Sequence, residues 1–394
     1  MIYDVIIIGM GPAGSTAAYE AASRGLSVLA LDQSAFPRYK ACGGGLTTKI
    51  HQLVDLENLS CIENRISSFR LSYRSHQKTF HQDKPFAYLV MRDQFDQMLV
   101  ERAVKAGVDF KGETRVQKID EQNDLMEVHT DCLTFKARVA VGADGALGFT
   151  TRWLNPCLKS KNAPALEGEF KRNHDPVDSS SIEIEVGAVE SGYGWIFPKR
   201  ECLSIGAASF SGNQKIKKSY QSYMTEVFSK TNPSLLLPDP PPKPAVCLKE
   251  TGHPIPIFTS PGLKLVSKRL MLAGDAGHLV DPFFGEGIYY AMRSGQIAGR
   301  ASETFIKKGA SLKGYAKKIE KEFYPEFRGA KRMAWLIYRF PGLWFDLTLK
   351  HPGVIQLYTE VLAGKREYRN FLSTVLKTAF KKILLPNSFI KRLV

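Results

Sequence analysis

The stretch Tyr3-Asp4-Val5-Ile6-Ile7-Ile8-Gly9-Met10-Gly11-Pro12-Ala13-Gly14 decides the fold of this 394-residue chain. Its apolar part is typical of a buried strand, and Gly9-x-Gly11-x-x-Gly14 follows where that strand gives way to a helix. In such a turn one glycine makes the bend, one lets the backbone approach a pyrophosphate, and one lets helix and strand touch. Asp32 ends the next strand, 18 residues after Gly14, where a carboxylate binds ribose hydroxyls. The pattern predicts a dinucleotide site but does not distinguish FAD from NAD.

Length and composition indicate a globular protein of two or three lobes, because 394 residues exceed what one core usually supports. The six cysteines show neither a CxxC pair nor the clustered spacing of a structural zinc site, so we expect reduced thiols and no metal. No basic region precedes the first strand, which argues against a signal peptide. No apolar run reaches about 18 residues. We therefore expect a cytoplasmic enzyme.

The positive charge is concentrated at the end of the chain. Of the net charge of +15, the segment from Lys331 to Val394 carries +9, with 12 Lys or Arg against 3 Asp or Glu. Large apolar side chains alternate with these bases, which is typical of a segment lying on an anionic bilayer: Trp335, Leu336, Tyr338, Phe340, Leu343, Trp344, Phe345 and Leu347. We expect peripheral membrane contact here. The alternatives are a solvated basic helix face and, least favoured because no nucleic-acid-binding signature accompanies the charge, a nucleic-acid partner.

Later segments return to the first lobe after an intervening β-rich part. An amphipathic helix is predicted after Arg92, and the apolar strand 139–141 leads into a glycine turn. Alternation from 180 to 210 predicts antiparallel strands, a helix is expected over 215–230, and prolines between 238 and 244 indicate an extended connector. A strand at 269–273 and a helix at 287–304 then follow. We predict an α/β protein with a discontinuous FAD-binding Rossmann domain (1–48, 90–155, 263–308), an antiparallel substrate lobe (49–89, 156–262) and a basic amphipathic helical region (309–394).

Two of these later segments resemble the remaining fingerprints of flavoproteins of the p-hydroxybenzoate hydroxylase type, which have the glutathione-reductase-like fold. They are Gly142-Ala143-Asp144-Gly145 and Gly274-Asp275-Ala276-Gly277-His278-x-x-Asp281-Pro282-x-x-Gly285-Glu286-Gly287. The resemblance implies FAD, with Asp275 on the ribityl chain and Arg92 reaching the cofactor; a surface arginine is the alternative. The residues themselves fit, since glycines at a helix start bring backbone N–H groups toward a flavin carbonyl. The predicted cofactor-binding residues are Gly9, Gly11, Gly14, Asp32, Gly44, Arg92, Asp144, Gly145, Asp275, Pro282, Gly285 and Gly287.

Narrower features resemble the geranylgeranyl reductase family. Pro37-Arg38-Tyr39-Lys40-Ala41-Cys42-Gly43-Gly44-Gly45 is similar to that family's loop beside the flavin, and Tyr193-Gly194-Trp195-Ile196-Phe197-Pro198-Lys199 is similar to its aromatic signature. The similarity runs from residue 1 to about 305. One departure is Glu190, where archaeal members often carry proline, which leaves the choice of lipid open. Family members saturate double bonds of isoprenoid chains, so the resemblance implies an oxidoreductase acting on CH–CH groups of such a lipid.

The candidate catalytic residues are Cys42, Tyr193 and Trp195, and the candidate substrate-binding residues are Lys40, Tyr193, Trp195 and Phe197. On a strand, Tyr193, Trp195 and Phe197 project to one face, where they form either a pocket wall or a core stripe. Cys42 is either active or a small residue needed for close packing. Lys40 either holds a phosphate head group or is solvated.

The expected reaction is hydride delivery from flavin N5 with protonation of the other alkene carbon, by Cys42, Tyr193 or a bound water. His278 is expected to shape the turn after Asp275. NADPH or reduced ferredoxin is the expected electron donor, and the protein is expected to be a monomer. The alternatives are an FAD-dependent monooxygenase and a flavin-dependent halogenase, whose signature ends in Trp-x-Ile-Pro, one residue shorter than Trp195-Ile196-Phe197-Pro198 here. A non-catalytic isoprenoid-binding protein resembling the Rab GDP-dissociation inhibitors is a third.

Overall fold

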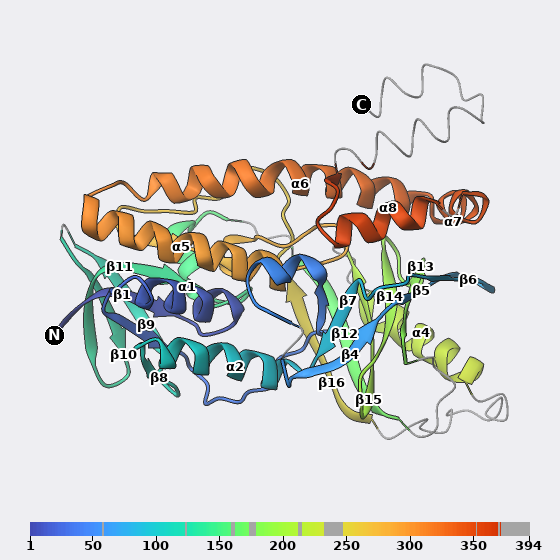
Figure 1. Cartoon of the computed structure of the whole chain (residues 1–394), viewed down its shortest axis with the longest axis horizontal. Helices are drawn as coiled ribbons and strands as arrows, with labels where there is room; N and C mark the ends of the chain where they lie inside the picture. The colour runs from blue at the N-terminus through green and yellow to red at the C-terminus, as the bar shows by residue number, and fades with distance from the viewer. Residues whose placement is uncertain are drawn as a thin grey trace, which may run out of the picture.

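The computed structural model shows two sheet-containing lobes roofed by long helices (Figure 1). It describes residues 1–56, 59–122, 124–158, 162–172, 179–211, 215–231, 247–351, 353–368 and 371. The proline-rich stretch 238–244 and the last part of the basic tail lie outside these residues.

The first lobe is built on a seven-stranded sheet of order β8-β2-β1-β11-β10-β9, with β17 beside β11. Its strands are β1 Ile2–Ile8, β2 Val28–Leu31, β8 Asp109–Lys111, β9 Val116–Glu121, β10 Met126–Thr130, β11 Thr134–Gly142 and β17 Leu270–Leu272. The strands β8, β2, β1, β11 and β17 are parallel to one another. Strands β10 and β9 extend the sheet beyond β11 with antiparallel pairing. Because parallel strands are buried on both faces, β1 and β2 are continuous apolar runs. This is the doubly wound lobe predicted from the sequence.

Helices α1 (Pro12–Ala22), α2 (Arg92–Lys105) and α5 (Ile288–Lys308) pack on this sheet (Figure 1). A Cβ atom at Gly295 of α5 would lie 2.2 Å from the carbonyl oxygen of Ala13, so α1 and α5 approach to backbone contact. Helix α5, which follows the third fingerprint, is thereby held against α1, which follows the first fingerprint.

The second lobe is a largely antiparallel seven-stranded sheet of order β16-β12-β15-β14-β13-β5-β6. Its strands are β5 Ser68–Tyr73, β6 His76–His81, β12 Ala163–Lys171, β13 Ser181–Val186, β14 Gly192–Pro198, β15 Cys202–Ser209 and β16 Cys247–Ile255. Helix α4 (Ile216–Thr231) packs Tyr220 and Tyr223 against one face of it. A small sheet of β3 (Gly45–Thr47), β7 (Ala87–Val90) and β4 (Ile62–Ile66), with the 3-10 helix η1 (Thr48–Gln52), joins the lobes.

Three helices follow at the C-terminal end: α6 (Lys313–Arg339) extends over both lobes, whereas α7 (Pro341–Lys350) and α8 (Gly353–Leu362) lie over the second lobe (Figure 1). The first half of α6 contributes Phe323 and Phe327 to the core of the first lobe, and its second half contributes Met333 and Ile337 to the core above the second sheet. This region is therefore part of the folded body. Among the described residues, no helix combines the length and apolarity that crossing a bilayer requires.

Candidate active site

The turn between β1 and α1 can be made only with glycine at two positions. Gly9 has a φ of +93°, and a Cβ there would lie 2.4 Å from the carbonyl oxygen of Ala143. A Cβ on Gly14 would lie 1.8 Å from the carbonyl oxygen of Gly9. The first N–H groups of α1 have no acceptor within the helix, so they and the helix dipole face outward as an anion site.

Asp32 lies at the end of β2, next to this turn. Its carboxylate accepts the N–H of Met10 at 2.7 Å and the N–H of Ser34 at 2.9 Å. Buried and held from two sides, it marks the end of the parallel strands at which α/β sheets bind nucleotides.

Asp144 follows β11 and packs its backbone on the same turn, since a Cβ at Gly9 would lie 2.9 Å from the Cα of Asp144. Its carboxylate, however, accepts the N–H of Thr150 at 3.0 Å and that residue's hydroxyl, at the start of α3 (Phe149–Leu154). Burial raises the pKa of Asp144, although these hydrogen bonds oppose the shift. In this structure its side chain is engaged by α3, and Gly145 follows it with a φ of +80°.

The third fingerprint also borders the turn. Gly274 begins the 3-10 helix η3 (Gly274–Gly277), and a Cβ there would lie 2.8 Å from the Cβ of Ala13 in α1. The carboxylate of Asp275 lies 3.6 Å from the Cβ position of Gly287, immediately before α5. His278 adopts a left-handed conformation with a φ of 52°, and so shapes the turn as expected from the sequence. The three fingerprints, far apart in sequence, thus surround one helix start.

A basic wall faces that helix start. Arg92 makes a bidentate pair with buried Asp96, both bonds being 2.9 Å, and Nη2 of Arg38 lies 3.3 Å from the same carboxylate. Burial favours the neutral form of Arg92, but the charge of the Asp96 carboxylate and the hydrogen bonds to it outweigh this effect, so the pKa of Arg92 is raised. Within the part of the chain that the structure describes, Nη1 of Arg38 is buried without a hydrogen-bond partner, and Nη2 lies 3.4 Å from the Cβ position of Gly11. A guanidinium with a free N–H donor over a glycine turn fits the diphosphate of a dinucleotide.

Lys40 and His253 belong to the same wall. Nδ1 of His253 donates to the carbonyl of Pro254 at 2.8 Å, so Nε2 accepts from Nζ of Lys40, which it contacts. Burial lowers the pKa of Lys40 to about 8, although the negative charge of Asp275 opposes the shift. The sequence left Lys40 between a substrate phosphate and solvent; the structure leaves it half-buried and in contact with His253.

The loop Cys42–Gly45 lies between this wall and the aromatic strand β14. The N–H of Cys42 donates to Oε1 of Glu167 at 3.1 Å, and a Cβ at Gly43 would lie 2.9 Å from the ring of Phe197 and 3.2 Å from Nε1 of Trp195. Gly44 has a φ of +72°, and its Cβ position lies 2.1 Å from the carbonyl of Val90. Small residues are therefore needed throughout the loop.

Sequence reasoning missed the buried charges beneath this loop. Glu167 and Glu169 of β12 are buried, as is Lys199 at the end of β14, whose Nζ lies 3.9 Å from Oε1 of Glu169. Burial raises the pKa of Glu167, while Lys199 lowers it. Glu167-x-Glu169 alternates as on any half-exposed strand, so the sequence carried no signal that both carboxylates would be enclosed.

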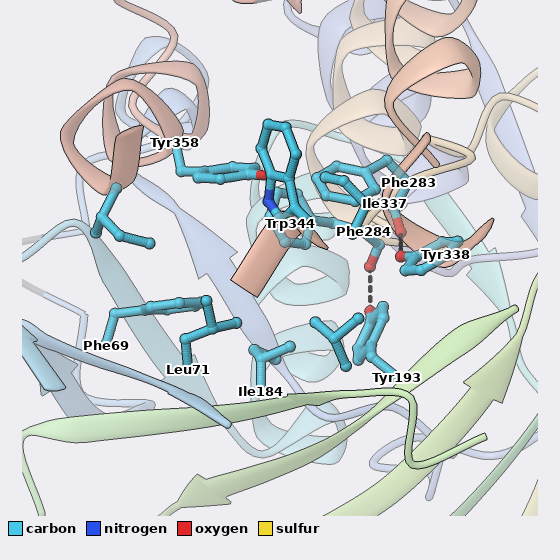
Figure 2. Close-up of a pocket in the computed structure, with 12 residues that line it drawn as sticks. Phe69, Leu71, Ile184, Tyr193, Phe283, Phe284, Ile337, Tyr338, Trp344 and Tyr358 are labelled. Atoms are coloured by element: carbon cyan, nitrogen blue, oxygen red, sulfur yellow. Dashed lines mark hydrogen bonds between the residues drawn. The ribbon is translucent and has the colours of Figure 1, made fainter. Parts of the chain in front are cut away.

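An aromatic cavity of about 30 Å³ lies beyond the loop, between the second sheet and the roof (Figure 2). It is lined by Phe69, Leu71, Ile184, Val186, Tyr193, Phe283, Phe284, Ile337, Tyr338, Trp344, Ile355 and Tyr358. Of the three alternating aromatic residues of β14, only Tyr193 lines it. The three rings form a row that leads back to the glycine loop. The ring centroids of Tyr193 and Trp195 lie 6.1 Å apart, and those of Trp195 and Phe197 lie 6.3 Å apart.

Two tyrosines connect the cavity to the third fingerprint. The hydroxyl of Tyr193 donates to the carbonyl of Phe284 and that of Tyr338 to the carbonyl of Phe283 (Figure 2). Burial raises the pKa of Tyr193 well above its usual range. Oδ1 of Asp281 accepts the N–H groups of both phenylalanines, at 2.7 and 2.8 Å. One turn, residues 281–287, therefore borders the nucleotide motifs at one end and walls the cavity at the other.

Comparisons with known proteins agree with this geometry. Residues 4–149 match the family described as FAD dependent oxidoreductase. An uncharacterised protein of Methanosarcina barkeri is 30% identical over 392 residues, covering 98% of this chain and 97% of its own. The digeranylgeranylglycerophospholipid reductase of Methanocaldococcus jannaschii is 29% identical, and the match covers 82% of this chain and 83% of the relative. The geranylgeranyl diphosphate reductase of Rhodobacter capsulatus is also 29% identical, and the match covers 78% of this chain and 77% of the relative.

Solved structures share the fold. A geranylgeranyl bacteriochlorophyll reductase-like protein of Thermoplasma acidophilum superimposes with a TM-score of 0.77 at 22% identity, covering 100% of this chain and 99% of its own. A flavin-dependent brominase superimposes with a TM-score of 0.73 at 19% identity, covering 97% of this chain and 100% of its own. The basic wall, the glycine turn and the three fingerprints fit FAD, and the chain belongs to the geranylgeranyl reductase family of FAD-dependent oxidoreductases.

Proposed function

We propose that this oxidoreductase reduces carbon–carbon double bonds of a geranylgeranyl or other polyprenyl chain on a lipid-like substrate. The observation that carries the proposal is the aromatic cavity walled by Phe283 and Phe284, because these residues belong to the cofactor fingerprint itself. An apolar chain in this cavity would lie next to the cofactor turn. The names of the two reductase relatives, which refer to geranylgeranyl substrates, support the same substrate class.

The cavity is narrow in this structure, since its volume of about 30 Å³ leaves room for water molecules but not for a prenyl chain. A larger open groove of about 510 Å³ adjoins it, lined by residues 79–83 and by Gly353, Ile355 and Gln356. Ile355 lines both spaces, and Phe69 of the cavity is the cross-strand partner of Phe80 in the groove. We assign this groove as the entrance, with Ile355 as the side chain that must move.

Bound FAD, once reduced by NADPH or a reduced ferredoxin, supplies hydride. The protein's part is to hold the cofactor with the twelve fingerprint residues named above and the basic wall of Arg38, Lys40 and Arg92. The cavity excludes water and aligns the chain, and its aromatic faces stabilise positive charge that develops at the more substituted alkene carbon. Tyr193 and Trp195 act as positioning residues, since the hydroxyl of Tyr193 is engaged by a backbone carbonyl. Cys42, in the loop between the basic wall and the row of aromatic rings on β14, remains the candidate proton donor.

The test is product mass. Dithionite-reduced enzyme given a geranylgeranyl lipid should yield products heavier by pairs of hydrogens. In deuterated water each reduced bond should gain two deuterium atoms, because dithionite supplies only electrons and both added hydrogens then come from solvent. Leu71→Trp, which fills the cavity from the sheet side, should retain FAD and abolish reduction. Leu133→Trp is the matched control, because Leu133 is exposed on the first lobe. Unchanged lipid mass with a fully loaded flavoprotein would refute the proposal.

A halogenase or monooxygenase activity is the alternative that the brominase-like fold suggests. Both consume oxygen, whereas reduction of a double bond does not. Oxygen uptake that depends on an apolar substrate, or incorporation of bromide, would replace the reductase proposal.

A further inference from the structure

The second half of α6 has two faces of opposite character. Residues at helical spacing point inward, with Met333, Ala334 and Ile337 buried above the cavity. The stripe at positions 328, 331, 332, 335 and 339 is exposed and continues into α7 across the helix junction. The helix that roofs the cavity therefore presents a second, outer surface.

This outer surface, which we name the roof face, carries an apolar patch at the α6–α7 junction. Trp335 is 57% exposed, Phe340 40% and Leu343 69%. The ring centroids of Trp335 and Phe340 lie 6.2 Å apart in an edge-to-face arrangement, so these two exposed side chains form one surface. Exposed apolar side chains that lie together are typical of an interaction site.

Bases surround the patch. Between residues 328 and 350 there are five bases and one acid, all exposed: Arg328, Lys331, Arg332, Arg339, Lys350 and, as the acid, Asp346. The guanidinium of Arg339 lies 5.8 Å from the ring of Phe340, so charge and aromatic surface are in contact. Trp and Phe beside Arg and Lys are suited to the interface of an anionic bilayer, where rings enter the head-group region and bases meet phosphates.

The tail aromatic residues that the sequence grouped together are thus divided by the fold. Trp344 and Phe345 are buried against the second sheet, and Tyr338 lines the cavity, whereas Trp335, Phe340 and Leu343 point outward. We infer that the roof face docks on an anionic lipid bilayer, holding the cavity and its groove at the membrane surface from which a prenyl lipid enters. The purpose of docking, which is access to a prenyl lipid, rests on the proposed function, whereas binding to vesicles can be measured independently of it.

The experiment is flotation of the full-length flavoprotein with vesicles of phosphatidylcholine, with and without 30% (roughly a physiological anionic fraction) phosphatidylglycerol. The triple variant Trp335→Ser/Phe340→Ser/Leu343→Ser should lose at least about tenfold in vesicle binding. Leu133→Ser/Leu147→Ser is the matched control, because those leucines are 59% and 63% exposed on the first lobe. It should bind vesicles like the unmodified protein. Flavin absorbance and thermal melting confirm that both variants are folded.

Two further measurements separate charge from insertion. Arg332→Glu/Arg339→Glu should weaken binding to the anionic vesicles by about fivefold or more for each base, and added salt should have the same effect. Brominated lipids should quench tryptophan fluorescence in the unmodified protein and much less in Trp335→Phe, since Trp195 and Trp344 are buried and Trp153 is partly buried in α3 of the first lobe.

The outcomes are distinguishable from those of the proposed function. Equal vesicle binding by triple variant and control, or no binding to anionic vesicles at all, overturns the docking surface even if detergent-dispersed lipid is still reduced. Tight binding of an oligonucleotide by the same bases, with no vesicle binding, would assign the roof face to nucleic acid instead. Vesicle binding without lipid reduction leaves the surface standing and refutes only the reductase proposal.

Discussion

At the cofactor edge, Gly9 packs against Asp144, and Gly274 packs against α1, at distances that leave no room for a Cβ atom. The cavity under the roof is instead lined by side chains from three strands of the second sheet, from the turn 281–287 and from three helices. The first region admits no added methyl group, because its contacts are already at van der Waals distance without one. The second depends on filled volume, because its walls are aliphatic and aromatic side chains from β5, β13, β14, α6, α7 and α8. The two regions share one turn, residues 281–287, and so their independence can be measured.

The largest effect is expected at the cofactor edge. Gly14→Ala places a Cβ 1.8 Å from the carbonyl oxygen of Gly9, which α1 cannot accommodate without leaving the sheet. Purified Gly14→Ala should lack flavin absorbance even after reconstitution with FAD. Gly314→Ala is the control: apart from its own helix, no atom of the described residues lies within 4 Å of the Cβ position of this helical glycine. The variant should remain yellow and be stabilised by up to about 1 kcal/mol. A yellow Gly14→Ala protein would show that the turn is not a backbone contact.

Removing a ring from the cavity should cost stability and leave the cofactor in place. Trp344→Ala deletes a buried side chain of the roof, and we expect the free energy of unfolding to fall by about 3–5 kcal/mol in urea denaturation. Trp335→Ala, at an exposed position, should change it by less than about 0.5 kcal/mol. Loss of FAD from folded Trp344→Ala would mean that the two regions are not separable.

The shared turn should respond to pH. Burial raises the pKa of Asp281 from 3.8 to about 6, with Glu286 adding to the shift, and its Oδ2 has no hydrogen-bond partner among the described residues. The folded state then holds this proton more tightly than the unfolded chain. Stability from this group is present below about pH 4 and is lost as the pH rises through 6, by about 3 kcal/mol.

Asp281→Asn keeps an oxygen acceptor for Phe283 and Phe284 but cannot ionise. Denaturation curves between pH 4 and 7 should therefore diverge, with the variant gaining about 3 kcal/mol relative to the unmodified protein over this range. Asp346→Asn, at an exposed carboxylate, should not change the pH profile. Parallel profiles for Asp281→Asn and the unmodified protein would rule out a buried titrating acid in the turn.

The smallest effect concerns the basic wall. Because burial lowers the pKa of Lys40 to about 8, its positive charge is lost as the pH rises through 8, and FAD should bind more weakly above that pH. In fluorescence titrations Lys40→Met should bind FAD about tenfold less tightly at pH 7, with the difference disappearing by pH 9.5. Exposed Lys313→Met should match the unmodified protein at both pH values. A constant difference across this range would show that Lys40 contributes packing but no charge.

Much of the cofactor edge could be predicted from sequence. Gly9, Gly14 and Gly274 each occupy a position that only glycine fits, and a strand followed by a glycine turn and a helix is a local pattern. The helices begun by Arg92 and following Gly287, and the antiparallel strands of the second lobe, are also where the periodicity predicts them. The partners of Glu167, Lys199 and His253 could not be predicted, because a charged residue on a strand is usually solvated.

A dinucleotide site at the first strand can be predicted from the local sequence alone, because a missing Cβ is a property of a single residue and its neighbours in the chain. The sequence also shows that the end of the chain is basic and aromatic. Which of those rings face the cavity and which face outward was settled by packing, which also brings Lys40 into contact with His253. Helical periodicity defines two faces of a helix, but burial is assigned only when another element, here the second sheet, packs against one of them.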